Sequence, residues 1–256
     1  MKRRLLVLFV ALLAFGAVKV PYEEHLERVH RAAFFHGAKL DLGLREQIGQ
    51  LGFLAALSGF RSLVADALYI HAHAAWERTE WGRMKLDFDA VTALQPRCVL
   101  FWDQAAWHMA FNASIAARDN PKQPREALRI RDQRQYWKLG EDYLLRGIAN
   151  NPERPLLYDR LGFLYREKFK DHCKSAAIYA ECAKLPGAPQ YAHRFAAYEL
   201  AQCPGHEREA YELLLALFHK GEDERLPTLL RILGELQEKL NVPPERKVDT
   251  RAPSHP

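Results

Sequence analysis

Hydrophobic and small residues recur along residues 158–189 with the spacing of two short amphipathic helices. Tyr158, Leu161, Gly162 and Tyr165 fall at positions i, i+3, i+4 and i+7, so they share one face of a first helix. A second helix is marked by small residues that would let a neighbouring helix approach closely, namely Ala176, Ala180 and Ala183. The segment therefore predicts a helix–turn–helix unit.

The same pattern returns with a period of 34 residues, and strand signals such as alternating Val/Thr runs are scarce. We therefore expect an all-α fold with about four helix pairs over residues 65–242. Downstream, the corresponding positions are Ala192, Phe195, Ala196 and Glu199, followed by Ala210, Leu214 and Leu217. Upstream, they are Leu68, Ala72 and Ala75 in the first unit, and Trp102, Ala105, Ala106 and Met109 in the second.

The second unit is longer than the others. Pro96 and Pro152 end successive units and are 56 residues apart, which exceeds one 34-residue period by 22. We place this insertion between the two helices of the unit, at about residues 117–135. Residues 118–134 hold six Arg or Lys and three Asp or Glu, a net charge of +3. A solvated loop with a short helix is the simplest expectation, and contact with a lipid headgroup or a polyanion is the alternative.

The two ends of the chain differ from the repeats. Three basic residues at positions 2–4 precede 14 apolar positions, Leu5 to Val18, as in an export signal. As a helix this run would rise about 21 Å, which is short for a hydrocarbon core of about 30 Å. Residues 1–21 thus predict an uncleaved signal anchor or, second, a cleaved signal peptide. The basic start places the rest of the chain outside the cytoplasm, on the periplasmic side of a bacterial inner membrane.

Three further segments complete the predicted organisation. Residues 22–64 predict a helical segment that leads away from the membrane, with a break at Ser58-Gly59. Leucines at helical spacing over residues 225–241 predict a helix that caps the open end of the repeats. The tail, residues 243–256, is expected to be disordered.

Composition and short motifs exclude several classes of function. The 256 residues are 48% hydrophobic, enough to bury a sizeable core, and the net charge of +5 is weak evidence for nucleic acid. No Gly-rich phosphate loop, C-x-x-C pair or H-E-x-x-H helix is present. The cysteines are too widely spaced for a compact zinc site, and although their even number permits disulfides in an exported protein, buried thiols are the simpler interpretation. They are Cys98, Cys173, Cys182 and Cys203.

The repeated units resemble the tetratricopeptide-repeat (TPR) family across about residues 65–240. YDRLGFLYREK and the units in register with it carry this resemblance. Two departures are His71, where a large apolar residue is usual, and the displaced prolines that close the third and fourth units. GFRSLVADALYI, AWHMAFN and YDRLGFLYREK are also similar to a group of uncharacterised bacterial proteins with one N-terminal membrane segment. The resemblance implies an α-solenoid of tetratricopeptide-like helix hairpins preceded by a membrane or signal helix.

In that family the first helices of successive units line a concave groove, and the resemblance carries ten residues over to it. Aromatic and acidic side chains on such a surface suit an extended or helical peptide, whereas ordinary packing between helices is the alternative. We therefore expect a protein-interaction scaffold of a bacterial envelope assembly, with no catalytic residue, cofactor, metal or nucleic acid. The predicted groove residues are Asp66, Tyr69, His73 and Trp76 in the first unit, Asp103, Trp107 and Phe111 in the second, and Asp159, Phe163 and Arg166 in the third.

A function of a different class stays open: an enzyme or small-ligand-binding domain with a pocket around Asp66, His73 and His108. His71 and His73 point about 200° apart on a helix, so they cannot bind the same metal ion. Arg61 and Asp66 are expected to form a structural charge pair inside the core. Nucleic-acid binding through the basic insertion is the weakest alternative. An open groove would favour the scaffold, and a closed pocket with converging side chains would favour the enzyme.

Overall fold

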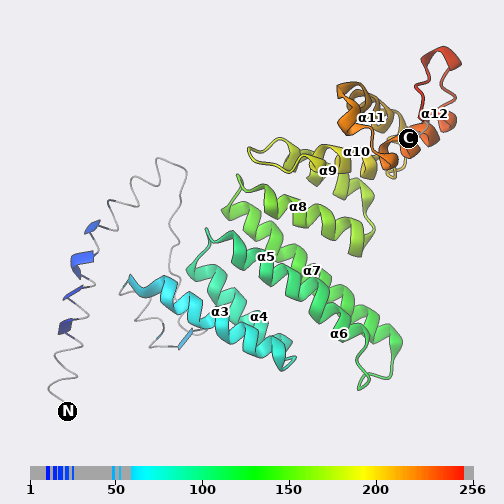
Figure 1. Ribbon diagram of the computed structural model, residues 1–256. Helices are drawn as coiled ribbons and strands as arrows, with labels where there is room; N and C mark the ends of the chain where they lie inside the picture. The colour runs from blue at the N-terminus through cyan, green and yellow to red at the C-terminus, as the bar shows by residue number, and fades with distance from the viewer. Residues whose placement is uncertain are drawn as a thin grey trace, which may run out of the picture. The chain divides into compact units, whose positions relative to one another are not determined.

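The computed structural model describes residues 59–250 continuously, together with residues 10, 11, 14, 15, 17–19, 21, 22, 25, 48, 49 and 52. Most of the predicted signal helix at residues 1–21 and most of the predicted segment at residues 22–64 therefore lie outside the described residues. Within the described part, no helix combines the length and the apolar character that a membrane span requires. The described residues form helices and turns with no strand among them, which confirms the all-α prediction (Figure 1).

The chain divides into two compact units, residues 1–151 and residues 152–256, which we describe separately as unit 1 and unit 2. In unit 1, α3 packs against α4, and the continuous run of α5, η2 and α6 packs against α7. The bounds are α3 (Arg61–Glu77), α4 (Trp81–Leu94), α5 (Val99–Trp107), the π-helical η2 (His108–Ala113), α6 (Ser114–Arg118) and α7 (Glu126–Asn150). Gly59, with φ of +83°, precedes α3, and the predicted break at Ser58-Gly59 lies at the edge of the described residues.

The predicted insertion lengthens both helices of the second pair. Residues 117–135 comprise the end of α6, a connection at residues 119–125 and the first turns of α7. Pro121 and Pro124 lie in the connection, where they interrupt no helical hydrogen bond. α7 reaches 25 residues, about 37 Å of helix. The expectation of a solvated loop with a short helix is thereby corrected, because most of the inserted residues extend two packed helices.

His71, which stands where the TPR pattern has a large apolar residue, has a hydrogen-bonding partner in the structure. Nδ1 of His71 on α3 lies 2.8 Å from Oδ2 of Asp87 on α4, and Asp87 is buried. A hydrogen-bonded pair thus joins the two helices at a position where the TPR pattern would place an apolar residue. Because each partner satisfies the other, the buried carboxylate avoids the cost of an unpaired polar group.

Unit 2 begins with the helix–turn–helix that the pattern at residues 158–189 predicts. Lys170 adopts a left-handed conformation with φ of 54° and ends the first helix. The side chain of Asp171 then accepts a hydrogen bond from the Lys174 amide at 2.9 Å and caps the second. The bounds in this unit are α8 (Pro155–Leu164), η3 (Tyr165–Phe169), α9 (His172–Ala183), α10 (Tyr191–Leu200), α11 (Glu207–Lys220), η4 (Glu222–Glu224), α12 (Pro227–Lys239) and η5 (Pro244–Arg246).

Gly162 lies at the closest approach of α8 and α9. Leu161 and Tyr165 beside it are buried, as the predicted face requires. A Cβ atom at Gly162 would come within 2.8 Å of the Tyr179 ring, and Oγ of Ser175 donates to the Gly162 carbonyl at 2.9 Å. The glycine therefore permits the tight contact between the two helices.

A disulfide joins Cys173 at the start of α9 to Cys203 just after α10, with a Cα–Cα distance of 4.9 Å. The interpretation of all four cysteines as thiols is therefore corrected, while Cys98 and Cys182 are free. The two bonded cysteines are 30 residues apart in the sequence. The bond crosslinks α9 and α10, the pair of helices with the most extensive contact in unit 2.

The C-terminal region differs from the prediction of a disordered tail. A helix, α12, lies within the segment predicted to cap the repeats, residues 225–241, and it buries Leu229, Leu233 and Leu236 in the core of unit 2. Residues 243–250 fold back onto it. The Gln237 side chain donates to the Val248 carbonyl at 3.2 Å and accepts from the Val248 amide at 2.7 Å. Two complementary hydrogen bonds thus fix the chain up to residue 250, and residues 251–256 lie outside the described part.

Candidate functional site

Predicted groove residues from α3 meet side chains of the next helix pair in unit 1. The Tyr69 ring lies 5.2 Å from that of Phe101, and the His108 ring lies 5.6 Å from His73 and 5.4 Å from Trp76, between centroids. Residues 69, 73 and 76 share one face of α3 because they are spaced by four and three. We use the name aromatic face of unit 1 for two neighbouring groups of rings. One group is Tyr69, His73 and Trp76 with His108, and the other is Trp107 stacked on Phe111.

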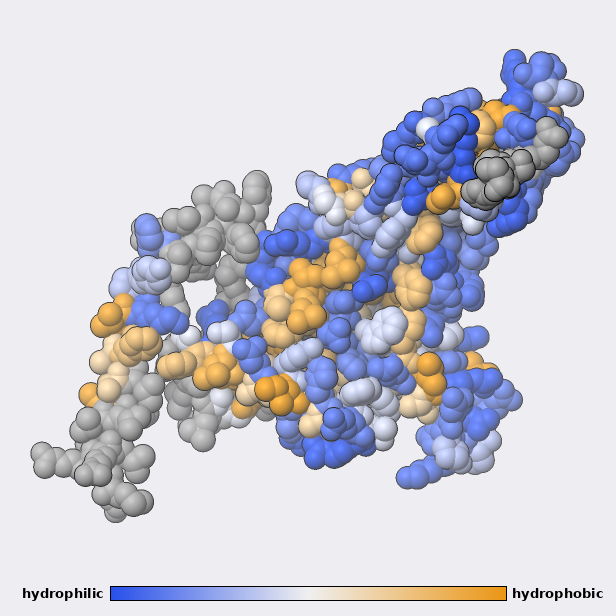
Figure 2. Space-filling view, viewed as in Figure 1, coloured by the Kyte–Doolittle hydropathy of each residue, from blue (hydrophilic) through white to orange (hydrophobic). Residues whose placement is uncertain are grey.

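Two tryptophans of the aromatic face remain open to solvent. Trp76 is 40% exposed and Trp107 is 41% exposed. The Trp107 ring stacks on that of Phe111 with centroids 4.3 Å apart and planes inclined by 15°. Figure 2 shows that hydrophobic residues on the visible side of the molecule form separate groups among hydrophilic ones. Large rings that are neither buried nor scattered singly are typical of contact surfaces for partners.

His108 forms the buried base of this face. It lies in the π-helical turn η2, and Nδ2 of Asn112 lies 2.9 Å from its Nδ1. Burial, and secondarily the nearby His73, lowers the pKa of His108 from 6.5 to about 4. The ring is therefore neutral at pH 7, where it packs against Trp76 as an uncharged aromatic group.

The predicted groove acids are mostly not available at the surface. Asp66 is exposed on α3, whereas Asp103 and Asp159 are buried. In unit 2, Asp159 accepts a hydrogen bond from the Tyr191 hydroxyl at 3.0 Å. Two of the three acids that were expected to attract basic side chains of a peptide are therefore buried. The hypothesis of peptide binding now depends mainly on the exposed aromatic residues.

The third predicted set, Asp159, Phe163 and Arg166, lies in unit 2. The Arg166 guanidinium lies 5.2 Å from the Phe163 ring centroid and 5.0 Å from that of Phe195. Such stacking of a cation on two rings holds the arginine side chain in place. Phe163 is half-buried, so this set forms a packed cation–aromatic cluster within its own unit.

The alternative pocket around Asp66, His73 and His108 is only partly assembled. His73 and His108 converge, but Asp66 is exposed two helical turns from His73, about 10 Å along the axis. Nδ1 of His73 lies 3.1 Å from the Tyr69 carbonyl instead of a carboxylate. Among the described residues, no three His, Cys, Asp or Glu side chains are grouped to hold a metal ion. The exposure of Asp66 also corrects the prediction that it pairs with Arg61 inside the core.

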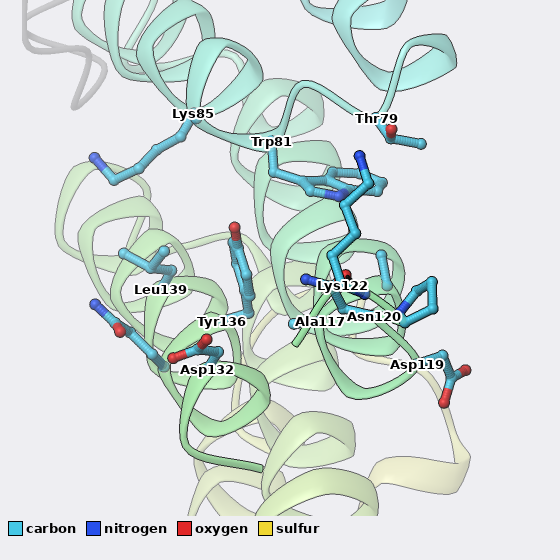
Figure 3. Close-up of a pocket in the computed structure, with 14 residues that line it drawn as sticks. Thr79, Trp81, Lys85, Ala117, Asp119, Asn120, Lys122, Asp132, Tyr136 and Leu139 are labelled. Atoms are coloured by element: carbon cyan, nitrogen blue, oxygen red, sulfur yellow. Dashed lines mark hydrogen bonds between the residues drawn. The ribbon is translucent and has the colours of Figure 1, made fainter. Parts of the chain in front are cut away.

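A pocket that the sequence did not predict lies between the start of α4 and the inserted segment. Its volume is about 680 Å³, within the range of small-ligand sites. Trp81 from α4 and Tyr136 from α7 both extend into the hollow, and Lys122 extends from the connection toward the side where Trp81 lies (Figure 3). The only sequence feature that pointed to this pocket was the position of the insertion. A 34-residue period predicts the repeated helices but not the contacts that inserted residues make.

Comparisons with protein-family models and with curated proteins found no match to this chain. The resemblance to the TPR family therefore stays a prediction that rests on the residues quoted above.

Proposed function

We propose that this chain is a tetratricopeptide-like helical-repeat scaffold that binds a peptide or helix of a partner protein on the aromatic face of unit 1. The observation that carries the proposal is the exposure of Trp76 and Trp107 at 40% and 41%. Exposed tryptophans contribute large contact area at little entropic cost, and they are enriched among residues that dominate binding energy.

The arrangement of helices supports the repeat interpretation. Each helix of unit 2 from α8 to α12 packs against the next one in the sequence, as neighbouring helices do in a solenoid. In unit 1 the two pairs, α3 with α4 and α5–α6 with α7, are joined through α4 and α5. In this arrangement Trp76 on α3 and Trp107 on α5 stay exposed to a partner.

We further propose that the chain acts in the periplasm, tethered to the bacterial inner membrane by its first 21 residues. The basic and apolar N-terminal sequence supports export. The Cys173–Cys203 disulfide gives independent support, because such bonds persist in oxidising compartments and are rare in the cytosol. An alkaline phosphatase fused after residue 250 should be active, and an inactive fusion with normal expression would reject the periplasmic location.

Site-specific photo-crosslinking tests the binding face. A photoreactive amino acid at position 107, introduced into the full chain in its native cells, should give a discrete crosslinked product. The matched control is position 145, since Leu145 is 47% exposed on α7 outside the aromatic face. Trp76→Ala should abolish the product at position 107 while leaving the helical circular dichroism unchanged. Equal products at both positions, or none at 107, would refute the proposal.

A further inference from the structure

The pocket between α4 and the insertion is lined by two aromatic side chains. Trp81 opens α4 and Tyr136 projects from α7 toward the same space, and both are half-buried (Figure 3). The lining also includes three small residues, Gly82, Ala116 and Ala117. Two rings that extend into a hollow of about 680 Å³ leave room for a flat group.

Two backbone features keep this space open. A Cβ atom at Gly82 would meet no atom within 4 Å, so the helix surface there faces empty volume. Thr79 lines the same pocket with φ of 58°, an unfavourable conformation for a β-branched residue. Hydrogen bonds from the Thr79 amide to the Trp76 carbonyl and from the Glu80 amide to the Ala75 carbonyl, both 2.9 Å, hold this turn. Strain of this kind is concentrated at functional sites.

Four charged side chains line the pocket, two lysines and two aspartates. Lys85 is engaged by Asp89 at 2.6 Å, and the carboxylate of Asp132 is engaged by Arg131 at 2.8 Å. Asp119 points away from Trp81 and Tyr136 (Figure 3). The Lys122 ammonium makes no hydrogen bond or ion pair within the part of the chain that the structure describes. Lys122 is therefore the lining cation that is available to a ligand.

The Tyr136 side chain does not repel a bound anion, because its phenol is uncharged. Burial, and secondarily the charge of Asp132, raises the pKa of its phenol, so the ring is neutral at pH 7. It can stack against an aromatic ligand and still offer its hydroxyl as a hydrogen-bond donor.

We propose that this pocket binds an aromatic group that carries a carboxylate, stacked between Trp81 and Tyr136 with its charge on Lys122. Such a ligand is either a free aromatic acid or the C-terminal aromatic residue of a polypeptide. This site shares no residue with the aromatic face, so it stands independently of the proposed scaffold function.

Binding is tested on the full chain by isothermal titration calorimetry with four probes. N-acetyl-L-tryptophan should bind and its amide should bind at least tenfold more weakly, because only the acid can use Lys122. A Gly-Gly-Gly-Trp peptide with a free C-terminus is compared with its amidated form in the same way. A tenfold advantage of the peptide over the acetyl amino acid assigns the site to a polypeptide terminus, and its absence assigns it to a free acid. Failure of both acids to bind at millimolar concentration, or equal affinity of acid and amide, would overturn the proposal.

Two substitutions locate the binding in this pocket. Gly82→Leu fills the open space and should weaken binding at least tenfold, whereas Ala93→Leu at an exposed position of the same helix should not. Lys122→Glu should abolish the preference for the acid, whereas Lys138→Glu, exposed on α7 outside the pocket, should preserve it. Thermal unfolding by circular dichroism checks that all four variants fold. Unchanged affinity in both Gly82→Leu and Lys122→Glu would also overturn the proposal.

Discussion

The rings of His73 and His108 meet almost perpendicularly, with centroids 5.6 Å apart and planes inclined by 85°. They come from helices that are distant in the sequence, and His108 is buried whereas His73 is half-buried. Two imidazoles this close cannot both become charged without repulsion. This relationship makes the base of the aromatic face sensitive to acid.

We expect stability to fall as the pH drops from about 6.5 to about 4. The pKa of His108 is about 4 in the folded protein and has its ordinary value of 6.5 in the unfolded chain, so the unfolded chain takes up the proton first in this window. The loss should reach about 3 kcal/mol and level off below pH 4. Urea unfolding between pH 7 and pH 4 measures it, and NMR titration of the His108 ring gives the pKa directly.

His108→Phe should flatten this dependence on pH, because phenylalanine keeps ring contacts with Trp76 and Phe88 without titrating. His219→Gln is the control, since His219 is exposed in unit 2 and should leave the slope unchanged. If the slopes of His108→Phe and the wild type were the same, His108 would not be the acid-sensitive group.

Loss of the disulfide should destabilise unit 2. Closing a loop of about 30 residues removes entropy from the unfolded chain, and the expected loss in Cys173→Ser/Cys203→Ser is about 3–4 kcal/mol. Reductant should produce a similar loss in the wild type and in the control Cys98→Ser, but none in the double variant. Thiol titration of the denatured protein should find two free thiols before reduction and four after it. Four thiols before reduction would show that the bond does not form.

Gly162→Ala should lower the free energy of unfolding by about 1–3 kcal/mol, because its Cβ would lie 2.8 Å from the buried Tyr179 ring. Helix propensity alone predicts the opposite sign. The matched control is Gly82→Ala, where the Cβ meets open space and stability should rise by up to about 1 kcal/mol. Urea unfolding of both variants measures the change in the free energy of unfolding. A decrease for Gly162→Ala shows that the steric contact outweighs helix propensity, and an increase shows the reverse.

Gln237→Leu should release residues 243–250 from α12. The buried amide makes both hydrogen bonds to Val248, so their loss should cost about 1–3 kcal/mol and expose Arg246 and Lys247 to trypsin. Glu238→Gln removes only the exposed ion pair of Glu238 with Lys247 and should change the cleavage rate little. Rapid cleavage of the wild type at these sites would contradict the ordered tail.

The sequence could predict features that depend on residues close together in the chain. The helical period of 3.6 places Tyr158, Leu161, Gly162 and Tyr165 on one face, and the structure buries the last three and leaves Tyr158 half-buried. Counting between Pro96 and Pro152 located the insertion, because a repeat has a constant length. The all-α class and the capping helix α12 followed from the same local periodicity.

The tertiary structure alone decided which distant residues meet. The spacing of the four cysteines did not show that Cys173 and Cys203 form the disulfide. Spacing also did not show that His73 meets His108 while Asp66 stays exposed. It also could not show that the inserted residues lengthen α6 and α7 and enclose a pocket with Trp81. Periodicity determines the face of each helix because it acts within a few turns. The contacts between helices depend on how their side chains interlock, which local spacing does not encode.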